Sequence, residues 1–338
     1  MSNKVIRTVC YFTKNSNKDT LNKLLQKSNI LESKDYEIQT KRICTSEMNI
    51  GELGGKINEK YIWLNVGSLK LREANNQLND FLGTNDVSFN MDLTDVKITK
   101  EHVDILYKII NGNSAKTFNF CYVFNNSLSS PFFPAGCYKE EGFSVGLQLT
   151  DLSESCDTLE EWFDEIKKVF NELTILFKKD KEFLGIDSSI APVFNGKSSL
   201  IDFIKKIGYE FDYSVLSDNY LKITNFIKKQ NPQPIGLCGL MFPCLEDFGL
   251  TEEYEKGNFS IERNLFLSLH SGLGIDTYPI GIDQNKERIL NILKTVQGLS
   301  NKYKKPLSCR FVSDGKAKIG DMTNFKNEYL KDVIIRKI

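Results

Sequence analysis

Three short segments of the chain place an aspartate directly after Gly-Ile, at the end of an apolar stretch. These segments end at Asp187, Asp276 and Asp283, and a related acid pair, Glu246 and Asp247, follows another apolar stretch. A glycine before the acid allows close backbone approach or a positive φ. Carboxylates at the ends of buried strands collect at one edge of an α/β sheet or barrel, where such folds place their sites. We therefore expect these acids to share one rim.

Acids gathered in this way can bind a hard divalent cation or act as general acid and base. In a partly dry cleft they would repel one another unless a cation or raised pKa values relieved them. We predict catalytic roles for Glu246, Asp247 and Asp276, and a Mg²⁺ or Ca²⁺ site formed by Glu246, Asp276 and Asp283. The alternative is that the acids cap helices or pair with lysines, and for Asp187 capping is an equal alternative.

A second group of residues suggests how a substrate is held. Arg310 follows a strand-like stretch, and its guanidinium suits the anionic end of a substrate, although an ion pair with one of the acids is the alternative. Asp187, Gly315 and Lys316 complete the predicted substrate site. His270 ends a predicted helix and is a catalytic candidate, with a structural role at the negative end of the helix dipole as the alternative.

These side chains must be positioned by a chain in which strand and helix patterns alternate. Short stretches rich in β-branched and aromatic residues predict about ten strands, at 5–12, 36–44, 61–66, 87–91, 118–124, 143–149, 183–186, 235–242, 308–312 and 333–338. Apolar residues at three- and four-residue steps predict helices, at 18–28, 71–82, 100–111, 158–181, 198–207, 220–229, 260–270 and 285–302. With no low-complexity linker, the pattern predicts a single α/β domain over residues 1–338.

Charge and composition exclude several classes of protein. The 44 basic and 44 acidic residues cancel, so a nucleic-acid partner is not expected. No apolar stretch approaches the roughly 20 residues of a membrane helix, so no membrane partner is expected. The chain contains no G-x-G-x-x-G, P-loop, H-E-x-x-H or G-x-S-x-G motif, which argues against the common nucleotide redox enzymes, P-loop ATPases, zincins and serine hydrolases.

The eight cysteines are scattered, without a Cys-x-x-Cys pair, and the chain has only two histidines. This spacing argues against zinc sites and disulfides. We expect buried, reduced thiols that pack as small apolar groups. Reduced thiols predict a cytoplasmic location.

Several longer motifs, in order along the chain, resemble domain-of-unknown-function family 711, which is related to the UPF0210 proteins. They are the Pro-Phe-Phe-Pro-Ala-Gly stretch at 131–136 and the stretches 183–192, 239–247, 272–280 and 305–310. The resemblance implies a barrel-like core of about ten strands with surrounding helices, similar to the glycyl radical enzymes of the pyruvate formate-lyase type. It implies no particular reaction, because a shared fold does not carry the chemistry with it. Radical catalysis is not expected, since 310–315 matches the glycyl radical loop only faintly.

The chain departs from the pattern of the resembling family at two places. After Pro134 and Ala135 the family often has Ala-Tyr-His, whereas this chain has Gly-Cys-Tyr-Lys at 136–139. A Gly-Thr pair is also frequent in the family where this chain has 213–217. If these are functional elements, the activity of this member is altered or lost.

Together these observations predict an enzyme that acts on a small polar or anionic molecule at an acid-rich rim, with an optional divalent cation. The alternative is a protein that binds a small molecule without turning it over, or a structural or regulatory protein. Symmetric pairing is the commonest form of self-association, so a homodimer is expected.

Overall fold

The computed structural model describes residues 4–57, 61–192 and 198–338. Nine strands form one mixed sheet with the order β7-β6-β1-β2-β3-β4-β5-β9-β8. The strands are β1 (Lys4–Thr13), β2 (Tyr36–Thr45), β3 (Ile62–Ser68), β4 (Val87–Asp92), β5 (Phe120–Phe124), β6 (Gly142–Leu147), β7 (Phe183–Asp187), β8 (Gly274–Pro279) and β9 (Leu307–Val312).

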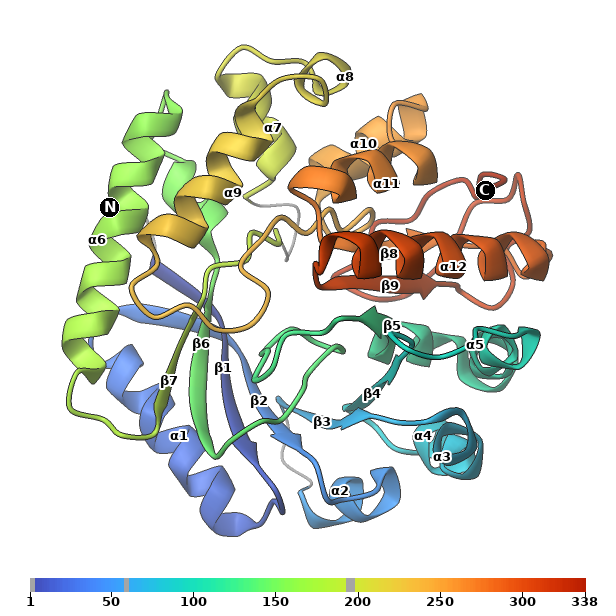
Figure 1. Cartoon of the computed structure of the whole chain (residues 1–338), viewed down its shortest axis with the longest axis horizontal. Coiled ribbons are helices and arrows are strands. Elements are labelled where there is room, and N and C mark those ends of the chain that lie inside the picture. The colour runs from blue at the N-terminus through green and yellow to red at the C-terminus, as the bar shows by residue number, and fades with distance from the viewer. Residues whose placement is uncertain (1–3, 58–60, 193–197) are drawn as a thin grey trace.

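The sheet consists of a parallel block flanked by two strand pairs that run the opposite way. Strands β1 to β5 are parallel to one another. On one side β6 pairs antiparallel with β1 and parallel with β7. On the other side β9 pairs antiparallel with β5 and parallel with β8. Figure 1 shows the strands curving around a central region with the helices outside them.

Continuous strand pairing ends at β7 and β8 in the described part of the chain. The stretch between them makes only isolated bridges, which join Pro234 to Ile186, Leu240 to Gly272 and Pro243 to Asp276. The expected barrel is therefore confirmed only in part, as a nine-stranded α/β sheet with surrounding helices that does not close.

Two of the predicted strands are not strands in the structure. The stretch 235–242 lies between prolines 234 and 243, which cannot donate hydrogen bonds to a neighbouring strand, and it contains two glycines. The stretch 333–338 makes one bridge, between Ile334 and Met322. Composition alone could not separate these extended segments from paired strands.

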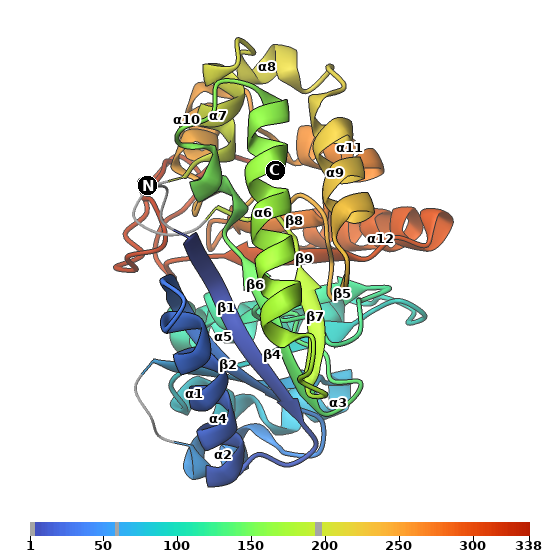
Figure 2. The ribbon, with the colours of Figure 1, turned by 90° about the vertical axis from the view of Figure 1, so that its left-hand side faces the viewer.

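The helices cover the outside of the sheet. Figure 2 shows α6 running lengthwise in front of β6 and β7, where Phe177 of α6 packs on Phe143 of β6 and Phe183 of β7. The predicted helix at 71–82 is divided into two short helices. The helices are α1 (Lys18–Glu32), α2 (Ile50–Lys56), α3 (Leu71–Asn76), α4 (Leu78–Gly83), α5 (Lys100–Asn113), α6 (Leu159–Phe177), α7 (Leu200–Lys206), α8 (Phe211–Ser214), α9 (Asn219–Gln230), α10 (Phe248–Lys256), α11 (Ile261–His270) and α12 (Lys286–Tyr303). No helix in the described ranges is long and apolar enough to cross a membrane.

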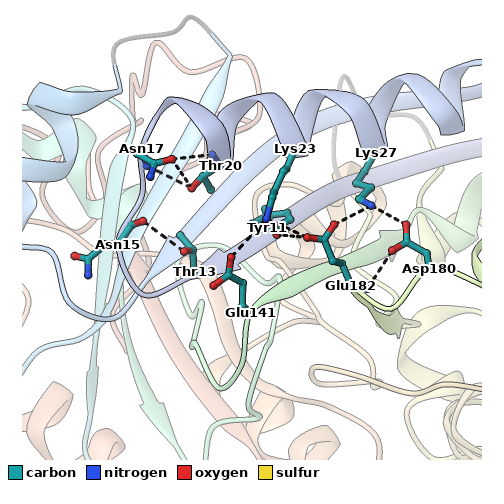
Figure 3. Close-up of polar contacts among 10 residues, drawn as sticks. All are labelled: Tyr11, Thr13, Asn15, Asn17, Thr20, Lys23, Lys27, Glu141, Asp180 and Glu182. Carbon is teal, nitrogen blue, oxygen red and sulfur yellow. Dashed lines mark hydrogen bonds and ion pairs between the residues drawn. The ribbon is translucent and has the colours of Figure 1, made fainter.

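A cluster of charged side chains fixes α1 against the sheet (Figure 3). Lys27 of α1 pairs with Asp180 at 2.7 Å and with Glu182 at 2.9 Å. Glu182 also accepts hydrogen bonds from Tyr11 at 2.9 Å and pairs with Lys23 at 3.1 Å. Burial opposes ionisation of Glu182, but the donors from Lys27, Lys23 and Tyr11 outweigh it and lower its pKa to about 2. Each charge has a partner, so this cluster serves the fold.

The segment between β5 and β6 lies on the inner side of the strands, in green in Figure 1. Side-chain donors from the sheet bind its backbone carbonyls: Arg42 donates to Pro131 at 2.7 Å, Asn65 to Pro134 at 2.8 Å and Asn90 to Gly136 at 3.0 Å. These bonds satisfy carbonyl groups that would otherwise be buried without partners. This segment thus covers part of the inner face of the sheet, and a cavity lies beside it.

Candidate functional site

A cavity of about 230 Å³ lies at the amino-terminal end of the parallel strands β1 to β5. Its lining combines arginine, glutamate and aromatic side chains from distant parts of the chain, and comprises Arg7, Glu37, Ile38, Gln39, Thr40, Arg42, Trp63, Phe118, Phe132, Phe133, Ala191, Glu246, Arg310 and Tyr329. Polar groups that converge in an enclosed, largely apolar cavity are typical of a small-molecule site.

Arg310, from β9, is held between two carboxylates. Its Nε donates to Asp276 Oδ1 at 2.6 Å, and its Nη2 donates to Glu246 Oε1 at 2.8 Å. All three side chains are at most 4% exposed. The guanidinium also lies over the rings of Phe118 and Phe132, at 4.8 and 5.6 Å from their centroids. Arg310 is therefore in the structural ion pair that was its alternative role, and it still contributes to the cavity wall.

Glu246 has an unusual acidity. Burial disfavours its charged form and Asp276 repels it, and these effects outweigh the attraction of Arg310, so its pKa rises to about 7. A carboxyl group with this pKa can both release and accept a proton near neutral pH.

Two further arginines, Arg7 from β1 and Arg42 from β2, contribute to the cavity. Arg7 is buried, and its Nη1 donates to the carbonyls of Ser189 and Ala191 at 3.2 and 3.5 Å. Arg42 donates to the carbonyl described above and lies 5.3 Å from the ring centroid of Phe133. Within the described residues, Arg7 Nη2 and Arg42 Nε are buried without a hydrogen-bond partner. Each of these N–H groups is available to an acceptor.

Burial is the largest influence on the pKa values of both arginines. Burial lowers the pKa of Arg7, although Asp187, Glu246 and Asp276 partly oppose this. Burial, with repulsion from Arg7 and Arg310, lowers the pKa of Arg42 to about 9. Arg7, Arg42 and Arg310 line the cavity together with Glu37 and Glu246. The feature that favours an anion is therefore not net charge but the unpartnered, buried N–H groups of Arg7 and Arg42.

Aromatic rings form a further part of the wall. Trp63 and Phe133 meet edge to face at 4.8 Å between centroids, and Phe118 and Tyr329 are stacked at 6.2 Å. These rings offer an apolar surface to the uncharged part of a ligand.

The structure brings Glu246, Asp276 and Arg310 together, as expected for a shared site. Asp187 is buried nearby. The negative charges of Asp187 and Asp276 both raise the pKa of Arg7, against the effect of burial. Asp187 Oδ1 accepts hydrogen bonds from the N–H and hydroxyl of Ser189 at 2.8 and 2.5 Å. Asp187 is the last residue of β7, which runs opposite to β1, so it lies where β1 to β5 begin and not at their carboxyl ends.

The other predicted site residues do not line the cavity. Asp283 is exposed and accepts a hydrogen bond from Ile319 N at 3.0 Å. Lys316 is exposed, and Gly315 packs beside Ser114. His270 Nδ1 lies 2.8 Å from the Ser271 hydroxyl at the end of α11, which fits its structural alternative. In addition, no three His, Cys, Asp or Glu side chains within 4–57, 61–192 and 198–338 are placed to hold a metal ion, so the predicted metal set is not assembled.

Asp247 serves the fold. Its side chain caps the N-terminus of α10 by accepting from Leu250 N at 3.3 Å. It also accepts from the Ser199 hydroxyl at 2.5 Å and from Leu200 N at 3.1 Å, at the start of α7. Burial raises its pKa to about 6, against the effect of these hydrogen bonds. The predicted catalytic role is replaced by the capping alternative.

Replacement of Asp247 by alanine should lower the free energy of unfolding by about 2–4 kcal/mol, because a helix cap is lost and buried donors are left without an acceptor. Urea denaturation of both proteins at pH 7.5 measures this loss. Asp247→Asn keeps an acceptor oxygen and should lose less than half as much. Equal stability of the alanine variant and the unsubstituted protein would contradict the capping role.

Sequence reasoning missed Arg7, Arg42 and the aromatic wall. The signal that could have found the arginines is a charged residue inside an otherwise apolar strand pattern, as in the stretch 5–12. A fully buried arginine needs partners, so such a residue indicates an internal polar site. The eight cysteines are all unpaired and seven are buried, as predicted.

Comparison with known proteins identifies a family, which is described as uncharacterised. The search of curated proteins found no match. A model of the uncharacterised ACR family, DUF711, matches residues 70–327, well over half of the chain, in agreement with the resemblance of its motifs. The chain belongs to the uncharacterised ACR family DUF711.

Proposed function

We propose that the cavity binds a small organic anion, a carboxylate or a phosphate, and that the protein is an enzyme in which Glu246 acts as general acid or base in the conversion of that anion. One observation carries this proposal: two guanidiniums with unpartnered, buried N–H groups border the same cavity as a glutamate whose pKa is raised to about 7.

Arginine N–H groups that are removed from water require acceptors, and oxygen atoms of an anion supply them at fixed geometry. Arg7 and Arg42 are therefore assigned to the anionic group. The aromatic rings around them would contact the apolar part of the molecule and exclude water, which strengthens charge interactions inside the cavity.

Glu246 is assigned the role of general acid or base. Its Oε1 is held by Arg310, which fixes the carboxyl group at the cavity wall. Arg310 is a positioning residue in this proposal, since it orients Glu246 and balances its charge. Glu246 and Asp276 were predicted from the sequence to bind a divalent cation. In this proposal they bind Arg310 instead.

The competing function is binding without turnover, as in a sensor, and the same cavity would support it. The two functions differ in the fate of the ligand. A ligand that binds and is recovered unchanged after long incubation supports the sensor, whereas a converted ligand supports the enzyme.

Wider features of the protein are also proposed. The isolated bridges between β7 and β8 support a core related to the pyruvate formate-lyase-type barrel, in a single α/β domain. Unpaired cysteines support a cytoplasmic location. A symmetric homodimer remains a prediction from its general frequency.

Anion binding is tested by thermal shift and isothermal titration with inorganic phosphate, propionate and 3-phenylpropionate at constant ionic strength. At least one of them should raise the melting temperature. Arg42→Gln should weaken that binding by about 10- to 100-fold, the effect of losing a charge-assisted hydrogen bond of about 1.5–3 kcal/mol. Arg72→Gln is the matched control, because Arg72 is exposed and does not line the cavity. Absence of binding by all three anions, or equal losses in the two variants, would contradict the proposal.

A further inference from the structure

We propose that the ligand carries a hydrogen-bond donor, a hydroxyl or an ammonium group, next to its anionic group, as in a 2-hydroxy or 2-amino carboxylate. The donor is received by Asp187 Oδ2, within a buried set of polar groups from Arg7, Thr8, Ser144 and Asp187, which we term the Asp187 subsite. This inference rests on the proposed function, because the subsite adjoins the same cavity through Arg7, which lines it.

The Asp187 subsite is formed by three neighbouring strands. Thr8 of β1 is paired with Gly146 of β6, and Gly146 is paired with Asp187 of β7. Ser144 lies two residues before Gly146, and residues two apart on a strand face the same side of the sheet. The side chains of Thr8, Ser144 and Asp187 therefore share one face, in adjacent rows.

Each member of the subsite has a polar atom that is buried without a hydrogen-bond partner among the described residues. These atoms are Arg7 Nη2, Thr8 Oγ1, Ser144 Oγ and Asp187 Oδ2. Arg7 is 4% exposed and the other three residues are 0% exposed. Buried polar atoms nearly always have partners, so several of opposite character on neighbouring positions indicate a place where another molecule completes the hydrogen bonds.

Arg7 and Asp187 attract each other electrostatically, but no hydrogen bond joins Arg7 Nη2 to Asp187 Oδ2. Two glycines let the backbone approach these side chains closely. A Cβ atom at Gly146 would lie 2.9 Å from Thr8 Cγ2 and 3.5 Å from Arg7 Nη2. A Cβ atom at Gly236 would lie 2.6 Å from Asp187 Oδ2.

The orientation of Asp187 is fixed from one side only. Its Oδ1 accepts from Ser189 and also from Cys238 N at 3.3 Å, whereas Oδ2 has no such bond. Cys238 has a φ of 45°, and Gly236, two residues earlier, has a φ of 73°. A positive φ is strained for a non-glycine residue such as Cys238. Backbone strain of this kind is found most often at functional sites. The turn at 236–238 thus holds Oδ1, while Oδ2 has no hydrogen-bond partner among the described residues.

The chemistry of the subsite selects the class of ligand. Arg7 lines the cavity, so the subsite and the proposed anion site share this residue. Its N–H groups require an acceptor, which a carboxylate provides. The unpartnered Oδ2 of Asp187 is a carboxyl oxygen that can accept a hydrogen bond from a donor. A molecule with a carboxylate and an adjacent hydroxyl or ammonium group meets both requirements, and a planar apolar substituent would contact the aromatic wall.

Three probes that differ only at carbon 2 test the inference: 3-phenylpropionate, 3-phenyllactate and phenylalanine, the last two as both enantiomers. Lactate and propionate form a smaller pair of the same kind. Isothermal titration should show at least tenfold tighter binding of a donor-bearing acid than of its unsubstituted counterpart. Asp187→Asn presents an N–H group in place of Oδ2 and should abolish any preference for the ammonium compound, with 3-phenylpropionate affinity changed less than threefold.

Two further variants control for changes in folding. Gly146→Ala keeps every polar group but places a methyl group in the subsite, and it should reduce the preference at least fivefold. Asp247→Asn alters an equally buried aspartate outside the cavity and should retain the full preference. Equal binding of donor-bearing and unsubstituted acids would overturn the inference and leave the proposed function intact. If none of these acids binds, the inference also falls, and the phosphate titration decides the proposed function separately.

Discussion

Replacing Arg310 by methionine is expected to lower the free energy of unfolding by about 3–5 kcal/mol at pH 8, the cost of leaving buried charges without their partner. The structure gives the reason directly, since Arg310 donates to both Glu246 and Asp276 and all three side chains are buried. Without the guanidinium, two carboxylates would be left close together in a region of low dielectric. The loss should shrink as the pH is lowered, because protonation removes the unpaired charges.

Urea denaturation between pH 5 and pH 8 measures this effect. Arg288→Met is the matched control, because Arg288 is about half exposed and lies 3.9 Å from an exposed Glu262. Exposed pairs contribute about 0–1 kcal/mol, so this variant should change little at any pH. Adding Glu246→Gln and Asp276→Asn to Arg310→Met should recover more than half of the lost stability. A loss of less than 1 kcal/mol, or one that is independent of pH, would contradict the arrangement.

Local patterns predicted the elements well where side-chain periodicity decides the conformation. The stretch 158–181 contains α6, because Trp162, Ile166 and Val169 form a buried stripe at helical spacing. The stretch 235–242 has the apolar composition of a strand but makes only bridges, because its flanking prolines interrupt a ladder. Closure of the sheet depends on such long-range pairing, which composition does not report.

The site was predicted in part for a similar reason. Glu246 and Asp276 stand at the ends of apolar stretches, a local signal, and Arg310 was recognised as their potential partner. Arg7 and Arg42 line the cavity because β1 and β2 lie opposite the chain around 246. The segment after β5 also packs on the inner face of the sheet, where it contacts Arg42. The position of that segment follows from contacts between residues far apart in the sequence.

The two departures from the family pattern acquire different meanings in the structure. At Gly136 a Cβ atom would lie 2.9 Å from Asn65 Cγ and Oδ1, so glycine suits the close approach of this segment to β3. The stretch 213–217 lies at and after α8, where Tyr213 and Leu216 are 70% and 81% exposed, and none of it lines the cavity. The first departure therefore concerns packing on the inner face, and the second concerns the outer surface. In this chain, none of the residues 136–139 and 213–217 lines the cavity.

The second large effect is expected in the pH dependence of stability, through Glu246. Its pKa is about 7 in the folded protein and has an ordinary value of 4.5. Below pH 4.5 the group is protonated in both states and carries no penalty. Between pH 4.5 and 7 the unfolded chain releases the proton while the folded protein keeps it, so the contribution to stability is lost as the pH rises. The loss amounts to about 3 kcal/mol for a shift of this size and is complete above pH 7.

Glu246→Gln removes this titration and keeps an oxygen that can accept from Arg310. The free energy of unfolding of the unsubstituted protein, minus that of the variant, should therefore fall by about 3 kcal/mol between pH 4.5 and pH 8, with the steepest change below pH 7. Urea denaturation of both proteins across this range gives the difference, in which other titrating groups cancel. The same difference for Glu262→Gln, at an exposed position, should vary by less than about 0.5 kcal/mol. If the Glu246 difference is flat, or rises with pH, then Arg310 outweighs burial, the carboxylate is ionised throughout, and Glu246 cannot exchange a proton with a ligand near neutral pH.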